Sequence, residues 1–278
     1  MNSVRQKPSS SSGVVSSSAS MGEKIAQLML GRFSKGRAFL TLLSDEVYYF
    51  FQYLFRRKGI YPGEISKQLF FMGYGSFPIV TMISFLVGIT ISLTTIQQLK
   101  LFGADIYLAD IVGYGLIREL VPLMTGIILA GKIGASVTAE IASMKVLEEV
   151  DALKVMGIVP ERFLMVPRLI GILLAVPLLV AIADFVGILG GFIIGQVTAG
   201  IPFIVFFNEM MSVVDVWDFL IGLLKTMVFG IVIVVCSGYK GFTVSMGAQG
   251  VGKATTESVV LSISMIIIID CIFALLLY

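Results

Sequence analysis

Five long apolar runs dominate the sequence and restrict the folds that it can adopt. Their approximate ranges are 72–97, 108–142, 163–197, 216–238 and 257–278. A helix needs about 20 apolar residues to cross a bilayer, so each run is long enough to span one. Charged residues make up only 14% of the chain and the mean hydropathy is +0.97, so a soluble fold would lack polar surface. The sequence therefore predicts an all-α integral membrane protein with five transmembrane helices.

The residue types that are missing exclude several functions. The chain has no histidine, and its two cysteines, Cys236 and Cys271, lie in apolar runs. A Ser–His–Asp triad, a Cys–His dyad and a His-ligated metal site are therefore excluded, and two thiols cannot complete a zinc site. A formal charge of +2 gives no basic field for nucleic acid. Transport or membrane scaffolding remains as the class of function, with no metal and no enzymatic activity expected in this chain.

Two segments precede the first apolar run and differ in composition. Residues 1–21 are rich in serine and lack the apolar core of a secretory signal, so they are expected to be a disordered tail. A plastid transit peptide has a similar composition but is usually longer. Residues 22–71 mix charged, apolar and aromatic side chains, which predicts amphipathic helices lying in the membrane interface. Residues 72–278 then form the transmembrane domain.

The basic residues outside the apolar runs predict the orientation of the chain. Lys and Arg concentrate in cytoplasmic loops. With a cytoplasmic N-terminus, the inner segments hold nearly all of these residues, whereas the outer segments hold Lys100. The C-terminus is then expected on the outer side. The inner set is Arg56, Arg57, Lys58, Lys67, Lys145, Lys154, Arg162, Lys240 and Lys253.

Two shorter segments are predicted to be helices that do not cross the membrane. Residues 201–214 are apolar and fall between two spans, which predicts a short helix at the outer face. Residues 144–157 predict one cytoplasmic amphipathic helix that ends at Gly157 and Pro160. Its charges allow Lys145–Glu149 and Asp151–Lys154 pairs, and Val146, Val150 and Leu153 would line one side.

Charged residues interrupt the apolar runs, and four of them are candidates for a buried site. Lys225 and Asp270 each lie near the middle of a span, and Arg118 and Glu119 lie in the second span. A charge at the bilayer centre costs about 2.5–3.5 kcal/mol on insertion scales, so pairing of Lys225 with Asp270 or Glu119 is expected. These residues could form a structural ion pair or a polar patch at a lipid cavity, and the sequence leaves both open.

Small residues recur at intervals of four along two spans. Gly126, Ala130 and Gly134 form one series, and Gly187, Gly191 and Gly195 form another. Such spacing allows close contact between helices in lipid. For the second series, packing within one chain is favoured over a dimer seam.

A stretch that partly matches a nucleotide-binding loop runs from Gly247 to Lys253. The next residue is Ala254, where a P-loop has Ser or Thr, and a membrane helix follows. The loop is therefore expected to be a cytoplasmic turn that binds no nucleotide, so any ATP and Mg²⁺ used by the protein would be bound by a partner chain.

The densest motif joins the second and third spans, and it carries a family resemblance. It reads GKIGASVTAEIASMKVLEEVDALKVMGIVPERFLMVPR and closely resembles the signature of the MlaE/YrbE-type permeases, the membrane subunits of ABC transporters that work with MCE proteins. Lys132 stands where the family usually has Arg, and Ala142-Ser143 where it has Gly-Thr. The matching residues are Gly131, Gly134, Ala139, Glu140, Met144, Lys145, Glu148, Asp151, Ala152, Leu153, Met156, Gly157, Pro160, Pro167 and Arg168.

Other segments are similar to the family as well. Arg118-Glu119-Leu120-Val121-Pro122 resembles its RELGP motif, with Val121 in place of Gly. The resemblance covers roughly residues 22–278. It implies a homodimer in the bacterial inner membrane or, less favoured, the plastid inner envelope. It also implies two cytoplasmic ATPase subunits, an MCE-domain protein outside, and phospholipid or a related lipid as cargo.

The resemblance further implies that residues 144–157 are a coupling helix seated on the ATPase. The residues expected to couple to it are Glu140, Lys145, Glu148, Glu149, Asp151 and Lys154. Two other functions remain possible from the residues alone. One is an ion-driven secondary transporter that uses Glu119, Lys225 and Asp270 as a proton relay, although the halves show no inverted repeat. The other is a non-transporting scaffold for an ATPase.

Overall fold

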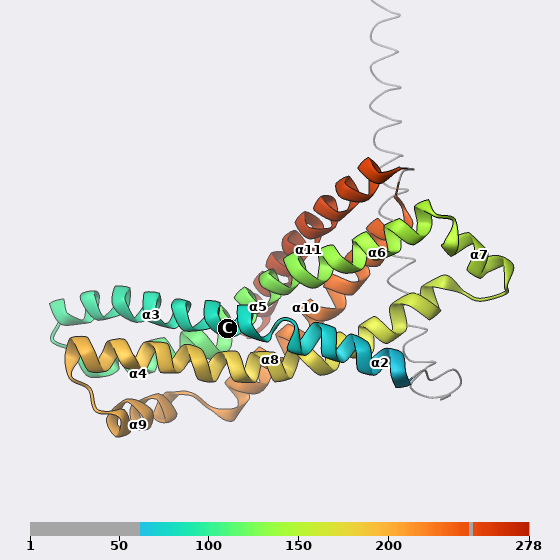
Figure 1. The fold of residues 1–278 in the computed structure, drawn as a ribbon. Coiled ribbons are helices and arrows are strands. Elements are labelled where there is room, and N and C mark those ends of the chain that lie inside the picture. Colours follow the sequence, from blue (N-terminus) through green and yellow to red (C-terminus); the bar gives the residue numbers. More distant parts are fainter. Residues whose placement is uncertain (1–61, 245–246, 278) are drawn as a thin grey trace, which may run out of the picture. The chain divides into compact units, whose positions relative to one another are not determined.

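The computed structural model describes residues 62–244 and 247–277, and these residues form helices joined by short turns (Figure 1). No strand occurs among them. The expected tail, and residues 22–61 of the expected interfacial region, lie outside the described residues. The helices are α2 (Pro62–Leu69), η1 (Phe70–Tyr74), α3 (Phe77–Leu101), η2 (Asp105–Tyr107), α4 (Leu108–Gly115), η3 (Leu116–Leu120), α5 (Val121–Leu129), η4 (Ala130–Gly134), α6 (Ala135–Val146), α7 (Glu149–Val155), α8 (Pro160–Ala199), α9 (Phe203–Val213), α10 (Val216–Phe242) and α11 (Ala248–Leu277).

Five helical stretches are long and apolar enough to cross a membrane, as the sequence predicts. They are Gly63–Leu101, Asp105–Val146, Pro160–Ala199, Val216–Phe242 and Ala248–Leu277. The predicted all-α integral membrane architecture is therefore confirmed. Several spans are longer than their apolar runs. Residues 62–71, assigned to the interfacial region from sequence, form α2 and η1 in the same helical stretch as α3.

The second and third spans exceed a bilayer thickness in different ways. The second is interrupted by two π-helical segments, η3 and η4, on either side of α5. The third, α8, is one helix of 40 residues with Pro167 and Pro177 inside it. A membrane helix tolerates internal proline where neighbouring helices and side chains satisfy the freed backbone groups. The two stretches have 42 and 40 residues, so both are longer than the roughly 20 residues that cross a bilayer.

Local sequence signals explain where helices begin and end. Gly200 has φ 67° and its amide donates to the carbonyl of Gln196, which ends α8 with a left-handed cap. Pro160 occupies the first turn of α8, where a missing amide proton costs nothing. Asp215 and Asp218 form a capping box at the start of α10. The predicted helix over 201–214 is confirmed as α9, which begins just after Pro202.

The predicted single helix over 144–157 is wrong, because the segment contains a break. The second span ends at Val146, and α7 covers Glu149–Val155. Glu148 between them has φ 60°, a left-handed conformation that is uncommon for a residue with a side chain. Figure 1 shows α7 at one end of α8 and α9 at the other.

Candidate functional site: a buried charge network

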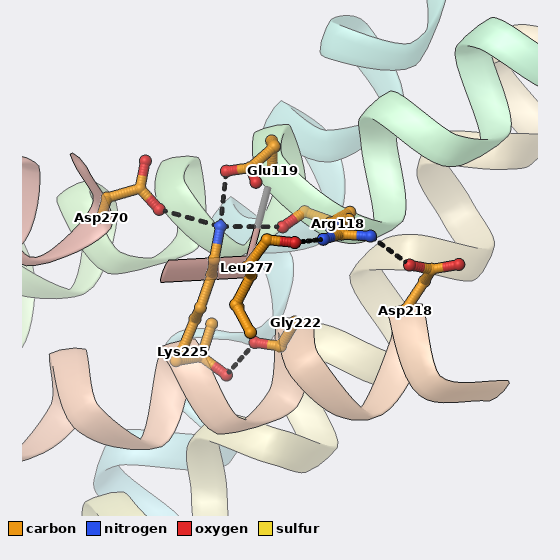
Figure 2. A network of polar contacts seen from close by, with 8 residues as sticks. Arg118, Glu119, Asp218, Gly222, Lys225, Asp270 and Leu277 are labelled. Atoms are coloured by element: carbon orange, nitrogen blue, oxygen red, sulfur yellow. Dashed lines mark hydrogen bonds and ion pairs between the residues drawn. The ribbon is translucent and has the colours of Figure 1, made fainter. Parts of the chain in front are cut away.

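Lys225 lies at the centre of a charge network that links three spans (Figure 2). Its ammonium lies 2.6 Å from Glu119 Oε2 in η3 and 3.3 Å from Asp270 Oδ1 in α11. The Lys225 side chain is 1% exposed, so the charge is removed from solvent by the chain itself. The predicted pairing is therefore confirmed, and Lys225 contacts both candidate carboxylates.

The two ion pairs of Lys225 differ in geometry. The ammonium donates a hydrogen bond to Glu119, and a longer one of 3.4 Å to the carbonyl of Arg118. The contact with Asp270 lies within ion-pair distance but lacks hydrogen-bond alignment, and Asp270 Oδ1 is buried without a hydrogen-bond partner. A charged hydrogen bond adds directional energy to Coulomb attraction, so Glu119 is the stronger partner.

A glycine and a π-helical segment bring the two sides of this network together. Gly222 lies one turn before Lys225, and a Cβ there would come 2.6 Å from the carbonyl oxygen of Ile117. Only a glycine allows α10 to approach η3 so closely. The wider π-helical turn of η3 carries both Arg118 and Glu119. Single π-helical turns of this kind are frequent at functional sites.

Arg118 makes a second set of contacts beside Lys225. Its Nη1 donates to Asp218 Oδ1 at 2.6 Å, and its Nη2 donates to the carbonyl of Leu277 at 3.0 Å. The guanidinium also lies 5.3 Å from the centre of the Tyr114 ring. Sequence reasoning missed Asp218. The available signal was the Asp215-x-x-Asp218 pair at the start of an apolar run, which also places a carboxylate within the first turn of a span.

We expect Asp218→Asn to destabilise the chain more than Asp215→Ala. Both changes disturb the capping box, and the loss of a helix cap typically costs about 1 kcal/mol of stability. Asp218→Asn also removes the anion from Arg118, whose side chain is only 11% exposed. Thermal unfolding in detergent would compare the two variants, and equal shifts in midpoint would show that the Arg118 pair contributes little.

Three further charged residues within the spans have separate environments. Lys132 donates to the carbonyl of Gly75, at the junction of η1 and α3. Arg168 is buried on α8 and binds Glu140 of α6 at 2.7 Å. Asp184 is buried on α8, and its Oδ1 has no partner among the described residues. The structure therefore places all three outside the network around Lys225.

The six residues predicted to contact an ATPase fall into two places. Glu140 lies within the second span and binds Arg168, whereas the others lie at or near α7. Lys145 Nζ contacts Asp151 Oδ2 at 2.7 Å, and Lys154 Nζ contacts Asp151 Oδ1 at 3.3 Å. The predicted Asp151–Lys154 pair is confirmed, but Lys145 pairs with Asp151 instead of Glu149. Glu148 and Glu149 are exposed.

Both series of small residues pack within the chain. A Cβ at Gly126 would meet Phe229 of α10, and Gly134 lies against Ile233 and Ser237 of the same helix, with Ala130 fully buried between them. On α8, the series faces other helices. Gly187 lies against Ser84 and Val121, Gly191 against Ser92 and Val112, and Gly195 against Leu108 and Phe206. The favoured interpretation of intrachain packing is therefore confirmed for Gly187, Gly191 and Gly195.

Five apolar spans, an ion-pair network between them and a short helix at one end define a helical integral membrane protein. The chain belongs to the MlaE permease family, whose model matches residues 65–276.

Curated relatives agree with this assignment. A probable ABC transporter permease protein of Rickettsia typhi is 37% identical over 219 residues, which is 79% of this chain and 85% of that protein. A protein of Synechocystis with the same description is 33% identical over 202 residues, 73% of this chain and 77% of that protein. The chloroplastic protein TRIGALACTOSYLDIACYLGLYCEROL 1 of Arabidopsis thaliana is 30% identical over 208 residues, 75% of this chain and 59% of that protein. The chain is therefore an ABC transporter permease.

Proposed function

We propose that this permease moves phospholipid or a related lipid between a bacterial inner membrane and an MCE-domain protein on the outer side. A separate ATPase binds ATP and Mg²⁺ and drives the movement. Two copies of the chain form the membrane part of the transporter. Family membership supports the proposal, and the chloroplast relative at 30% identity has a name that includes a diacylglycerol lipid.

The observation that carries the lipid assignment is the charge network within the spans. Two cations and three carboxylates meet among helices that are mostly apolar (Figure 2). The side chains of Glu119 and Asp270 remain 28% and 16% exposed, so the network reaches the surface of the chain. A phospholipid combines a charged headgroup with apolar tails. A polar patch among apolar helices offers complementary surfaces for both parts.

The exposed end of the second and third spans supports an ATPase partner. Around α7, Leu147, Val155 and Met156 are exposed although they are apolar, and acidic residues lie beside them. Apolar side chains exposed on a charged segment are typical of a protein interface. The excess of Lys and Arg on this side of the spans supports a cytoplasmic location for α7 and an outer location for α9.

Reconstitution tests the proposal against its rivals. The tagged chain is purified in mild detergent, co-purifying proteins and lipids are identified, and transfer of labelled phospholipid is measured in liposomes. We expect an ATPase and an MCE protein at fixed stoichiometry, with transfer that stops when the ATPase is inactivated. Transfer that persists with an inactive ATPase but stops with an uncoupler would instead favour the ion-driven transporter. A complex that assembles but never moves lipid would favour the scaffold.

A further inference from the structure

Two residues, Leu147 and Glu148, join α6 to α7, and the backbone of Glu148 makes hydrogen bonds to both helices. The amide of Glu148 donates to the carbonyl of Lys145 at 3.2 Å, which ends the preceding helix. Its carbonyl accepts from Asp151 and Ala152 at 3.1 and 2.9 Å, which begins α7. A left-handed residue between two helices changes the direction of the chain sharply, since helical dihedral angles stop and restart there.

A side-chain pair crosses this junction. Lys145 lies in the last turn of α6, and its ammonium donates to Asp151 Oδ2 in the first turn of α7 at 2.7 Å. The other oxygen of Asp151 accepts from Lys154, which lies on α7 itself. Asp151 thus has one partner across the junction and one partner within its own helix. The contact with Lys145 can therefore affect the orientation of α7, whereas the contact with Lys154 affects only the stability of α7 itself.

We propose that Lys145 and Asp151 are positioning residues that fix the direction of α7 relative to α6, and so set how much lipid moves per ATP hydrolysed. The proposal rests on the proposed function, in which α7 contacts the ATPase. Lys145 and Asp151 act through the position of α7, without contact with lipid.

The size of α7 explains why such a pair is needed. Seven residues form a helix about 10 Å long, which is too short to be stable alone in water. Val150 packs α7 onto the rest of the chain with 1% exposure, whereas Val155 near its far end is 89% exposed. A pivot at Leu147 and Glu148 would move that far end most. Lys145 precedes Glu148 and Asp151 follows it, so the ion pair between them restrains rotation of α7 about this pivot.

The restraint should be insensitive to pH over the physiological range. The hydrogen bond from Lys145, and then that from Lys154, lowers the pKa of Asp151 below its ordinary value of 3.8. A depressed pKa in the folded state means that the stabilisation is complete above pH 3.8 and is lost only as pH falls through the lower, folded value. We therefore expect the position of α7 to be the same at pH 7 and pH 5. A change between these two values would show that another group controls it.

Spin-label distances test the position of α7 independently of transport. Nitroxides are placed at Ser136→Cys on α6 and Val155→Cys in the full-length chain in nanodiscs, diluted with unlabelled chain. Cys271 is exposed and is replaced by Ser, whereas Cys236 is buried and is kept. We expect Lys145→Met and Asp151→Asn to broaden the distance distribution, and Lys154→Gln to leave it unchanged. Equal distributions in all variants would overturn the proposal, whatever the protein transports.

Coupling is measured as labelled lipid transferred per ATP hydrolysed in the reconstituted complex. We expect Lys145→Met and Asp151→Asn to lower this ratio about twofold to fivefold, as for loss of one partly exposed ion pair. Lys154→Gln removes the other cation that pairs with Asp151, but this pair lies within α7, so the ratio should not change. Lys145→Arg keeps the charge and should keep it too. A broadened distribution with an unchanged ratio would overturn the coupling role, whereas a wild-type complex without ATP-driven transfer would instead contradict the proposed function.

Discussion

Replacing Lys225 with methionine should destabilise the folded chain by about 3–5 kcal/mol, the loss seen when one partner of a buried ion pair is removed. The ammonium is almost fully buried and forms ion pairs with both Glu119 and Asp270. Methionine fills a similar volume but leaves two carboxylates close together without their shared cation. Loss of monodisperse protein in detergent and loss of lipid transfer are the expected results. The measurements are the thermal unfolding midpoint and the transfer assay described above.

Second substitutions separate electrostatics from packing at Lys225. Adding Glu119→Gln or Asp270→Asn to Lys225→Met should restore part of the stability, because each removes one of the two facing charges. The triple variant should restore the most. Glu119→Gln should rescue more than Asp270→Asn, since of the two carboxylates Glu119 is the one that loses a hydrogen bond from Lys225. Absence of rescue in every combination would contradict an electrostatic role.

A matched control for the same substitution is available on α11. Lys253→Met removes an ammonium that is 75% exposed and lies 3.9 Å from Glu257. An exposed pair at this distance contributes little to stability, so the variant should behave as the wild type. Rescued variants also separate two functions. If the triple variant folds but does not move lipid, the charges take part in transport. If it folds and transports normally, they serve packing alone.

The spans and the pairing of their charges could be predicted from sequence, but the details of the network could not. Apolar runs of 20 or more residues form helices in a bilayer, because a helix satisfies its own backbone hydrogen bonds. Opposite charges within such runs pair because an unpaired charge is costly in the membrane. Asp218 was missed because its partner Arg118 is 100 residues away. The local sequence around either residue does not determine which helices become neighbours. Sequence alone also gives no reason for Lys225 to contact two carboxylates.

Local departures from helical geometry were equally hidden. The break before α7 occurs at Glu148, where the sequence has no Gly, Asn or Pro, so the segment predicts one helix. That error also changed the expected partner of Lys145 from Glu149 to Asp151, because the break turns α7 relative to α6. The π-helical segments η3 and η4 likewise have no sequence signal of their own. Tertiary packing decides such features, since local propensity differs little between the alternatives.

Gly88→Ala should cause the other large loss of stability, about 3 kcal/mol, the upper end of the usual cost of overpacking. A Cβ at Gly88 on α3 would overlap the carbonyl oxygen of Gly187 on α8. The obstacle is backbone, so it cannot rotate away, and the two helices must separate. Gly191→Ala should cost less, because its Cβ would meet the side chains of Ser92 and Val112, which can adjust.

Gly252→Ala is the matched control for Gly88→Ala and Gly191→Ala, because it should raise stability or leave it unchanged. Gly252 lies within α11, and nothing is within 4 Å of a Cβ built there. Alanine favours a helix over glycine by about 1 kcal/mol, so this variant should be as stable as the wild type or more so. Unfolding midpoints should therefore follow the order Gly252→Ala, wild type, Gly191→Ala, Gly88→Ala. If Gly88→Ala matches Gly252→Ala, the close crossing of α3 and α8 is absent in the membrane, because an added methyl group could not fit between helices in contact at that point.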